Sequence, residues 1–570
     1  MVQKPPGPFQ APVTDRDRTV IYLSILIALF LAALDQTIVA TALPRMVEEL
    51  QGIDRYAWVA TAYLLASTGM ALIYGKLADT YSRKLITLGA MGLFLVGSVL
   101  CGLSGELGDL PLLGDGMTQL VVFRGIQGAG GGGLFAMTFI VIADLFTPAE
   151  RGKYQGYVGA VYGLASVLGP LVGGLLTDNA GGLVPGVEGW RWVFYVNLPV
   201  GVVALWFISR RMPRLEPPGE RLLPDLFGGA LLVGGLIPLI MSLQLDKRAY
   251  PWMSPVTVGL FALGTALLTA FVLRSRTASS PILDMRLFSN HVFRTANASA
   301  FFFGASFMSV TIFLPLFLVN VLGVSATRAG AALIPFSLGI VVGATLAGQI
   351  VHRVGYRGQL FAGGLVFLVT AVLLARMGPD VPYRLVTLYM VLAGLGVGPG
   401  MPLFTLAIQN AVDVRLVGQA TSAAQFFRQT GATVGAALMG TVLASTLALS
   451  FSTMELPAVW RARSGITLEE LVSTGGADLP DRIRSVYAEL ASERVSAEEA
   501  EEVIAQGTLV SERVATQVRE AFSLATSRIY WLTALLILVA TALVLRIPEV
   551  PLRTTHDRAA LEPHRVAHGS

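Results

Sequence analysis

Long apolar stretches dominate the pattern of this chain, and short segments rich in charged residues and proline separate them. A membrane-spanning helix needs about 20 mostly apolar residues. On this criterion the sequence predicts fourteen such helices, near residues 19–43, 55–77, 84–104, 118–145, 153–178, 191–211, 225–245, 253–274, 292–320, 328–351, 359–376, 383–410, 418–449 and 527–546. The pattern therefore predicts an all-α, polytopic membrane protein.

Basic residues gather in the connections on one side of these helices. The side shared with the two termini carries Arg83, Lys84, Arg151, Lys153, Arg210, Arg211, Arg214, Arg221, Arg274, Arg276, Arg353 and Arg357. The opposite loop from Ser104 to Thr118 has no Lys or Arg. Because cytoplasmic loops of membrane proteins are enriched in Lys and Arg, we expect both termini to be cytoplasmic, in a multi-pass protein of the plasma membrane.

Composition narrows the function classes further. Only 14% of the 570 residues are charged, against about 25% in soluble domains. The net charge of +4 comes from loop residues, so it gives no indication of nucleic-acid binding. The one cysteine, Cys101, and five histidines without metal-ligand spacing predict neither a metal site nor a disulfide. We find no phosphate-binding loop and no serine elbow, so we expect that the protein is not an enzyme and that it draws on an ion gradient. We also expect a monomer that needs no cofactor.

Asp35 is the one charged residue within the first apolar run. A carboxylate deep in a bilayer costs at least about 2.5–3.5 kcal/mol, so it normally faces a protein interior or a wet cavity. Burial favours the neutral form of the carboxyl group. Asp35 is therefore a candidate site for proton exchange, and the alternative is a structural aspartate bonded to a neighbouring helix.

Two pairs of stretches indicate an internal repeat. Gly75–Lys84 after the second predicted helix resembles Gly348–Arg357 after the tenth, and Gly130–Gly133 resembles the glycines from Gly396 to Gly400. We therefore expect two related six-helix bundles with two inserted helices, a plan used by secondary transporters. The expected units are residues 1–211, the linking helices in 212–290, helices 9–13 in 291–451, an extracellular polar loop in 452–526, and the last helix with the tail in 527–570.

The 452–526 loop is much longer than the other predicted connections. Thr467–Glu470 and Ser496–Glu499 have the pattern of capping boxes, which predicts short helices. A solvated cap is the simpler interpretation, and an extracellular lid or a partner-docking module is the alternative.

Several stretches resemble the fourteen-helix drug:proton antiporter branch of the major facilitator superfamily. They are Leu34–Pro44, Gly75–Lys84, Arg124–Gly132, Gly169–Gly174 and Trp190–Gly201. The resemblance covers nearly the whole chain apart from residues 452–526. It implies the major facilitator fold and export of amphiphilic small molecules in exchange for protons.

The resemblance also implies a conformational latch on the cytoplasmic side. Its residues are Gly75, Asp79, Arg83, Lys84 and Asp144, with an ion pair between Asp79 and Arg83 and Asp144 as a second partner. Thr80 and Ser82 depart from the family pattern, in which a basic residue and a glycine are usual at these positions. The alternative is that these charges only anchor the loop on the cytoplasmic side.

Arg124 lies about two turns inside the fourth predicted helix, where an arginine needs a carboxylate or carbonyl partner. The helix directions place it at a depth similar to that of Asp35. The resemblance implies a role for Arg124 in proton coupling; a purely structural tie between the first and fourth helices is the alternative. The corresponding part of helix twelve has no arginine, so we expect coupling in the N-terminal half.

Gly169, Pro170, Gly173 and Gly174 in the fifth helix match the antiporter motif, and the resemblance implies a flexible helix between the two halves. Generic packing of small residues is the alternative.

The thirteenth helix carries a further intramembrane charge, Arg428, close to Gln425. It either contacts an anionic group of a substrate or caps helix ends of the other half, and the structural role is the simpler one. Phe301 and Phe307 suit a pocket for flat apolar compounds, although packing and lipid contact are equally compatible with them.

Together these observations predict a proton-coupled multidrug exporter that works by alternating access, with protons and membrane lipids as its other partners. Export of lipids or lipid-like molecules is an alternative substrate class. A membrane receptor or scaffold built around the 452–526 loop is the alternative from another class.

Overall fold

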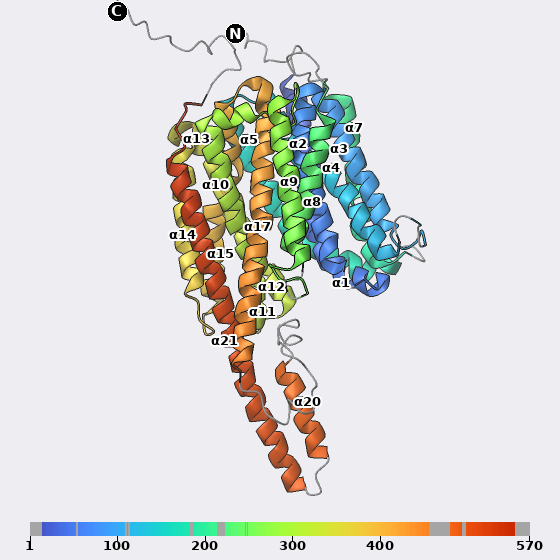
Figure 1. The fold of residues 1–570 in the computed structure, drawn as a ribbon, viewed down its shortest axis with the longest axis vertical. Helices are drawn as coiled ribbons and strands as arrows, with labels where there is room; N and C mark the ends of the chain where they lie inside the picture. The colour runs from blue at the N-terminus through green and yellow to red at the C-terminus, as the bar shows by residue number, and fades with distance from the viewer. Residues whose placement is uncertain are drawn as a thin grey trace, which may run out of the picture.

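The computed structural model describes residues 14–52, 55–108, 111, 114–182, 187–213, 223–245, 247, 249–454, 479–492 and 497–552. Within these residues the protein is all helical (Figure 1). Fourteen helical segments are long and apolar enough to cross a membrane. The predicted fold class is therefore confirmed.

The first seven numbered helices form the group that we call the N-terminal half. Their bounds are α1 (Asp15–Leu50), α2 (Tyr56–Thr80), α3 (Arg83–Gly102), α4 (Gly116–Leu145), α5 (Pro148–Asn179), α6 (Trp192–Tyr195) and α7 (Asn197–Arg211), with short 3-10 turns at Ala180–Gly182 and Gly189–Arg191. Helix α4 packs on α1, α2 and α3 and is almost wholly buried. This central position brings its polar side chains next to those of α1.

Two helices, α8 (Leu226–Gln244) and α9 (Pro255–Thr277), pack against each other beside α2. A 3-10 turn, Met285–Ser289, leads from them to the next group. They occupy the place expected for inserted helices.

We call α10 to α17 together with α21 the C-terminal half. Its bounds are α10 (His291–Met308), α11 (Leu314–Asn320), α12 (Ala326–Ala331), α13 (Leu333–Val354), α14 (Arg357–Ala375), α15 (Tyr383–Val397), α16 (Gly400–Ala411) and α17 (Val417–Ser452), followed by α20 (Leu479–Ser492) and α21 (Ala497–Leu545). A π-turn, Ser309–Phe313, separates α10 from α11, and a 3-10 turn, Val414–Leu416, precedes α17. Proline has no N–H to donate, so Pro315 and Pro399 mark the interruptions of the ninth and twelfth predicted spans.

The prediction of the last helix is wrong at its beginning. Helix α21 begins at Ala497, about 30 residues before the predicted span, and it projects from the bundle beside α20 (Figure 1). Apolar side chains such as Ile483 of α20 and Val514 and Val518 of α21 are buried in this hairpin. The second predicted helix of the loop is thus not a separate short helix. The Thr467–Glu470 box and Ser496 lie outside the described residues.

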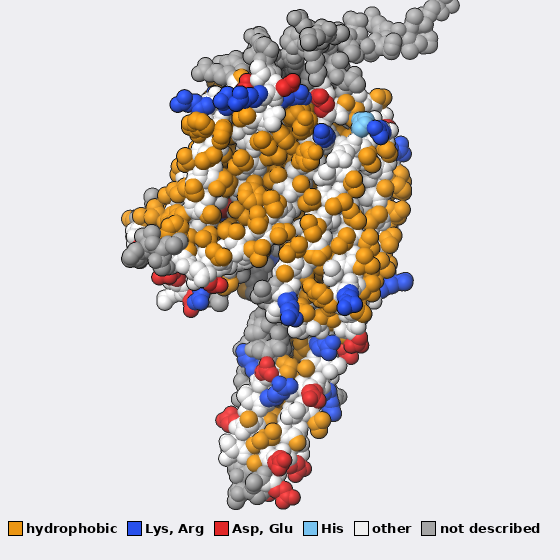
Figure 2. All heavy atoms as spheres, turned by 180° about the vertical axis from the view of Figure 1, so that it is seen from behind, with side chains coloured by type: hydrophobic (Ala, Val, Ile, Leu, Met, Phe, Trp, Pro, Cys, Tyr) orange, Lys and Arg blue, Asp and Glu red, His pale blue; other side chains and the backbone are white. Residues whose placement is uncertain are grey.

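The surface has the layers of a membrane protein. On the face that Figure 2 shows, apolar side chains form a belt across the bundle; some Lys and Arg side chains lie at its lower edge, and a row of them lines its upper end. This is the end where α1 begins and α21 ends, and we call it the basal end; the end that carries α20 is the distal end (Figure 1). Such a belt buries apolar side chains in hydrocarbon and leaves basic ones at an interface.

The halves meet along two seams between pairs of helices, α2 with α17 and α5 with α13. A Cβ atom on Gly75 would lie 2.7 Å from the carbonyl oxygen of Gly418, and one on Gly156 would lie 2.8 Å from that of Ala344. Gly348, the counterpart of Gly75 in the predicted repeat, faces Gly152 across the second seam. Glycine at these positions lets the helix backbones touch, so the halves are closed against each other in the basal part of the bundle.

Candidate functional site

Asp35 and Arg124 form a buried ion pair in the N-terminal half. Asp35 lies on α1 and is 0% exposed, while Arg124 lies on α4 and is 2% exposed. The Nη1 group of Arg124 donates to Oδ2 of Asp35 at 2.5 Å. Two residues that sequence reasoning placed at similar depths are thus in direct contact.

Two amide side chains complete the shell of the carboxylate. Gln127 Nε2 donates to Asp35 Oδ1 at 2.8 Å, and Asn197 Nδ2 donates to the same oxygen at 3.2 Å. The hydroxyl of Ser98 accepts from both amides. Sequence reasoning missed these residues, although Gln127 follows Arg124 by one turn and Asn197 lies in the recognised Trp190–Gly201 stretch.

The guanidinium of Arg124 is equally well surrounded. It donates to Gln127 Oε1 at 2.7 Å and to the carbonyl oxygen of Val59 at 3.3 Å, and it lies over the ring of Tyr63 at 4.4 Å from the centroid. Asp35 thus accepts from three donors, and the charges of Asp35 and Arg124 balance each other inside the helix bundle. Uptake of a proton by Asp35 would remove the charge on which this network depends.

A second charged cluster lies at the basal end of the N-terminal half. Arg83 Nε donates to Asp144 Oδ2 at 2.8 Å, and its Nη2 lies 3.7 Å from Asp79 Oδ1. The structure thus brings together the three charged residues Asp79, Arg83 and Asp144 of the predicted latch. Lys84, half-buried in the first turn of α3, forms no ion pair with any described residue.

Asp79 also crosses the seam between the halves, a contact that sequence reasoning did not foresee. Its two carboxylate oxygens accept hydrogen bonds from the backbone N–H groups of Gly418 and Gln419 at 2.9 and 2.8 Å. These groups belong to the first turn of α17, where N–H groups lack helical partners and the helix dipole favours an anion. One carboxylate therefore holds the N-terminus of a helix from the other half.

The glycines of the antiporter motif face the N-terminal half itself. Gly169 lies against Thr37 of α1, and a Cβ atom on Gly173 would come within 2.8 Å of the carbonyl oxygen of Ile38. Gly174 faces open space, and Pro170 lies within the continuous helix α5.

The side of α5 that meets α13 carries Gly152, Gly156, Gly159 and Gly163 instead. The expectation that the helix lies between the halves therefore holds for α5, but its contacts there come from these earlier glycines.

Arg428 lies between the halves and away from both clusters. It is half-buried, its Nη2 donates to Gln425 Oε1 at 2.5 Å, and Tyr162 of α5 lies within electrostatic range. The next residue, Gln429, accepts a hydrogen bond from Thr68 of α2 at 2.9 Å. Helix α17 thus contacts the N-terminal half at the residue next to Arg428.

The predicted cavity residues come from two helices that pack together. Gly304 of α10 lies against the backbone of Arg428, and the backbone of Phe301 lies against Gly431. The ring of Phe307 stacks on Phe336 with centroids 5.9 Å apart. The helix that carries Phe301 and Phe307 therefore packs directly on the helix that carries Gln425 and Arg428.

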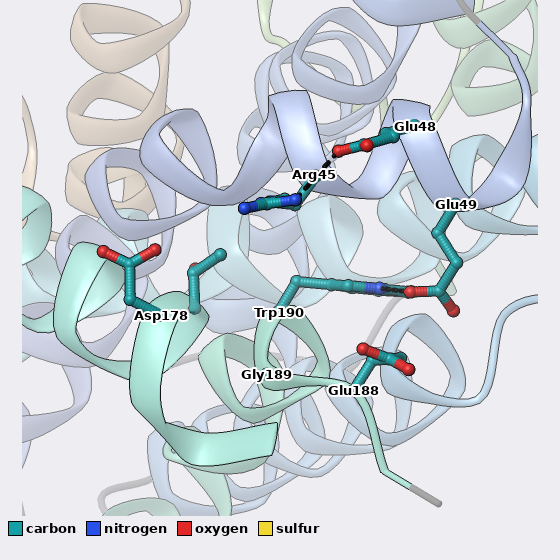
Figure 3. Close-up of a pocket in the computed structure, with 8 residues that line it drawn as sticks. Arg45, Glu48, Glu49, Asp178, Glu188, Gly189 and Trp190 are labelled. Atoms are coloured by element: carbon teal, nitrogen blue, oxygen red, sulfur yellow. Dashed lines mark hydrogen bonds and ion pairs between the residues drawn. The ribbon is translucent and has the colours of Figure 1, made fainter. Parts of the chain in front are cut away.

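A pocket of about 600 Å³ opens at the distal end (Figure 3). Its lining residues are Arg45, Glu48, Glu49, Thr177, Asp178, Glu188, Gly189 and Trp190. Within it Trp190 Nε1 donates to Glu49, which also pairs with Arg191 at 3.0 Å. None of the site residues expected from the sequence lines this pocket.

Two helical bundles that meet along glycine-lined seams, with a buried ion pair inside one of them, follow the plan of secondary transporters. Residues 25–436 match the sequence model of the Major Facilitator Superfamily. The chain belongs to this superfamily.

The relatives include proteins named for multidrug transport, multidrug resistance and efflux. The multidrug transporter protein MdtP of Bacillus subtilis is 37% identical over 426 residues, which are 75% of each chain. Multidrug resistance protein 3 of the same organism is 37% identical, over 74% of this chain and 79% of its own. The rubrofusarin-specific efflux pump aurT of Gibberella zeae is 31% identical, over 82% and 84%.

Solved structures share the fold. The proton:xylose symporter XylE aligns with a TM-score of 0.57 at 14% identity, covering 96% of this chain and 99% of its own. The human organic anion transporter MFSD10 aligns with a TM-score of 0.55 at 12% identity, covering 91% and 99%. At these identities the likeness concerns the fold alone.

Proposed function

We propose that this protein exports amphiphilic small molecules from the cytoplasm in exchange for protons. The observation that carries the proposal is the buried Asp35–Arg124 pair, because an intramembrane carboxylate held by an arginine is suited to binding and releasing a proton. The names of the relatives support multidrug efflux, and the basic residues at the basal end support cytoplasmic termini in the plasma membrane.

In the proposed cycle, a proton from the distal side neutralises Asp35 while the basal end is closed. The neutral carboxyl group holds Arg124 less strongly, so the packing of α1 on α4 changes and the seams release. Asp35 then loses its proton to the cytoplasm and re-forms the pair. One proton is enough for a tenfold substrate gradient, because each pH unit supplies about 1.4 kcal/mol per proton and each 100 mV about 2.3 kcal/mol per charge.

The basal cluster supplies the latch in this proposal. Asp79 binds the N-terminus of α17 and is oriented by Arg83, which Asp144 holds in turn. Breaking these contacts accompanies opening toward the cytoplasm. The glycines along both seams allow the close approach on which closure depends.

The test is transport by purified protein in liposomes under an imposed pH gradient. Asp35→Asn should bind substrate and exchange it across the membrane, but should lose gradient-driven accumulation, since an amide cannot take up the proton. Asp178→Asn, which changes an acid at the distal end, is the matched control. Wild-type accumulation by Asp35→Asn would refute the assignment of the proton site.

The two alternatives receive no comparable support. The relatives are named for multidrug transport, multidrug resistance and efflux, which favours neither lipid export nor a receptor built around residues 452–526.

A further inference from the structure

Arg428 lies near the middle of the membrane-spanning bundle and not at a membrane–water interface. It lies 11 residues into α17, or about 17 Å from the basal start of that helix. The neighbouring Gln429 bonds to Thr68 on the opposite half, and Tyr162 approaches the guanidinium from α5. The guanidinium is therefore placed between the halves, where an alternating-access path runs.

The charge of Arg428 has no acidic counterpart. The sequence contains no Asp or Glu in residues 285–379, 381–412 or 414–454, so helices α10 to α17 carry no carboxylate. Among the described residues Arg428 makes no ion pair, and Asp35 is already held by Arg124, Gln127 and Asn197. A lone intramembrane cation is expected to face a wet cavity and to mark a substrate path.

The surroundings of Arg428 fit a flat molecule with one acidic group. Gln425 fixes one edge of the planar guanidinium, which leaves further N–H donors suited to a carboxylate or sulfonate. Phe307 follows Gly304, which lies against the Arg428 backbone, by one turn of α10 and stacks on Phe336, and Phe135 packs beside Tyr162; these rings supply apolar faces. The guanidinium would repel cationic compounds, because no carboxylate of the described residues pairs with it and balances its charge.

We propose that the central site selects anionic amphiphiles, and that Arg428 binds their acidic group. This inference rests on the proposed function, and it names the substrate class. Exchange of an anion for an incoming proton moves two charges per cycle in the same electrical sense. Export of anions should therefore respond to membrane potential more strongly than export of neutral compounds.

The test uses three probes with one ring system and different charges: an anthracene carboxylate, its methyl ester and an anthracene methylamine. Binding to the purified full-length protein near neutral pH is followed by probe fluorescence. The carboxylate should bind about tenfold more tightly than the ester, as a charge-assisted hydrogen bond allows, and the amine most weakly. Equal or tighter binding of the amine by the wild-type protein would overturn the inference without any variant.

Variants then assign the preference to one side chain. Arg428→Gln should remove the preference for the carboxylate and leave ester binding within about twofold, and Arg428→Lys should keep part of it, because a lysine retains the charge but not the planar fork. Arg528→Gln, which removes an exposed arginine from α21, is the matched control. A full preference in Arg428→Gln, or an equal loss in Arg528→Gln, would contradict the assignment.

The two proposals fail in different ways. Gradient-driven transport of the ester without any preference for the carboxylate would refute the substrate class and leave proton-coupled export intact. Tight binding of the carboxylate without gradient-driven movement of any probe would refute proton coupling and leave the chemistry of the site intact.

Discussion

The N-terminal half surrounds the buried Arg124 with partners, whereas the C-terminal half gives the half-buried Arg428 a single side-chain acceptor. Arg124 contacts a carboxylate, an amide, a carbonyl oxygen and an aromatic ring. Arg428 has Gln425 and no acid within helices α10 to α17. The difference is what our two proposals require, namely one arginine enclosed by partners for coupling and a second one left with free donors for binding. Four predictions test this division.

The largest difference is expected when each arginine is replaced by methionine. Arg124→Met leaves the Asp35 carboxylate buried and unpaired, which should lower the free energy of unfolding by roughly 3–5 kcal/mol. Arg428→Met removes no ion pair and should lower it by less than about 1 kcal/mol. Unfolding of the purified proteins in mixed micelles measures both. Similar losses in the two variants would mean that Arg428 is as structural as Arg124.

The next largest effect is expected at the basal seam between α2 and α17. Gly75→Ala places a methyl group against Ser422 and Gly418 and should destabilise the closed seam by about 1–3 kcal/mol. Spin labels at positions 153 and 353 on α5 and α13 should then report longer basal distances. Gly89→Ala, where nothing lies within 4 Å, is the control. An unchanged distance in Gly75→Ala would show that the seam tolerates separation of the backbones.

An effect no larger than that of Gly75→Ala is expected from matched glutamine changes. Gln127→Leu removes a donor from the buried Asp35, which should cost about 1–3 kcal/mol and shift the pH dependence of transport. Gln425→Leu frees one edge of Arg428, so it should change substrate affinity and leave the pH dependence as it is. Transport measured over a range of external pH distinguishes the two. A shifted pH profile in Gln425→Leu would show that the Asp35 site and the Arg428 site do not act separately.

The smallest effect is expected for the exposed pair of Asp115 and Arg55, which serves as the reference for the buried Asp35–Arg124 pair. Hydrogen bonds from the Thr118 N–H and hydroxyl, together with Arg55, lower the pKa of Asp115 to about 2. A lowered pKa in the folded state stabilises the protein above about pH 4, and this stabilisation disappears as the pH falls toward about 2. Because the Asp115 side chain is 50% exposed, Asp115→Asn should cost less than about 1 kcal/mol at neutral pH and nothing at acidic pH. Thermal unfolding at both pH values checks this, and a loss as large as that of Arg124→Met would remove the contrast.

Much of the architecture follows from the distribution of apolar residues. Fourteen spans were predictable because each needs a run of apolar residues as long as the bilayer is thick. The beginning of α21 was not predictable from hydropathy, since its first 30 residues carry many charged side chains and become helical by packing apolar ones such as Val514 against α20. The π-turn before Pro315 was likewise invisible to a criterion based on length.

The candidate site was predictable only in part. Asp35 and Arg124 stood out because charges are rare in apolar helices, and helix direction gave their similar depth. The amide partners Gln127 and Asn197 lack such a signal, because uncharged polar residues occur widely in membrane helices. The contact of Asp79 with the N-terminus of α17 depends on how the halves meet, which a single helix does not encode.

Helix α21 extends without interruption from the apolar belt into the distal hairpin, a length of about 74 Å for its 49 residues. A stiff rod of that length acts as a lever with its short arm anchored among α10, α14 and α17. Small tilts of the anchored arm would sweep the tip through a much wider arc. A fluorophore attached near the tip would therefore report each turnover optically from outside the permeation route.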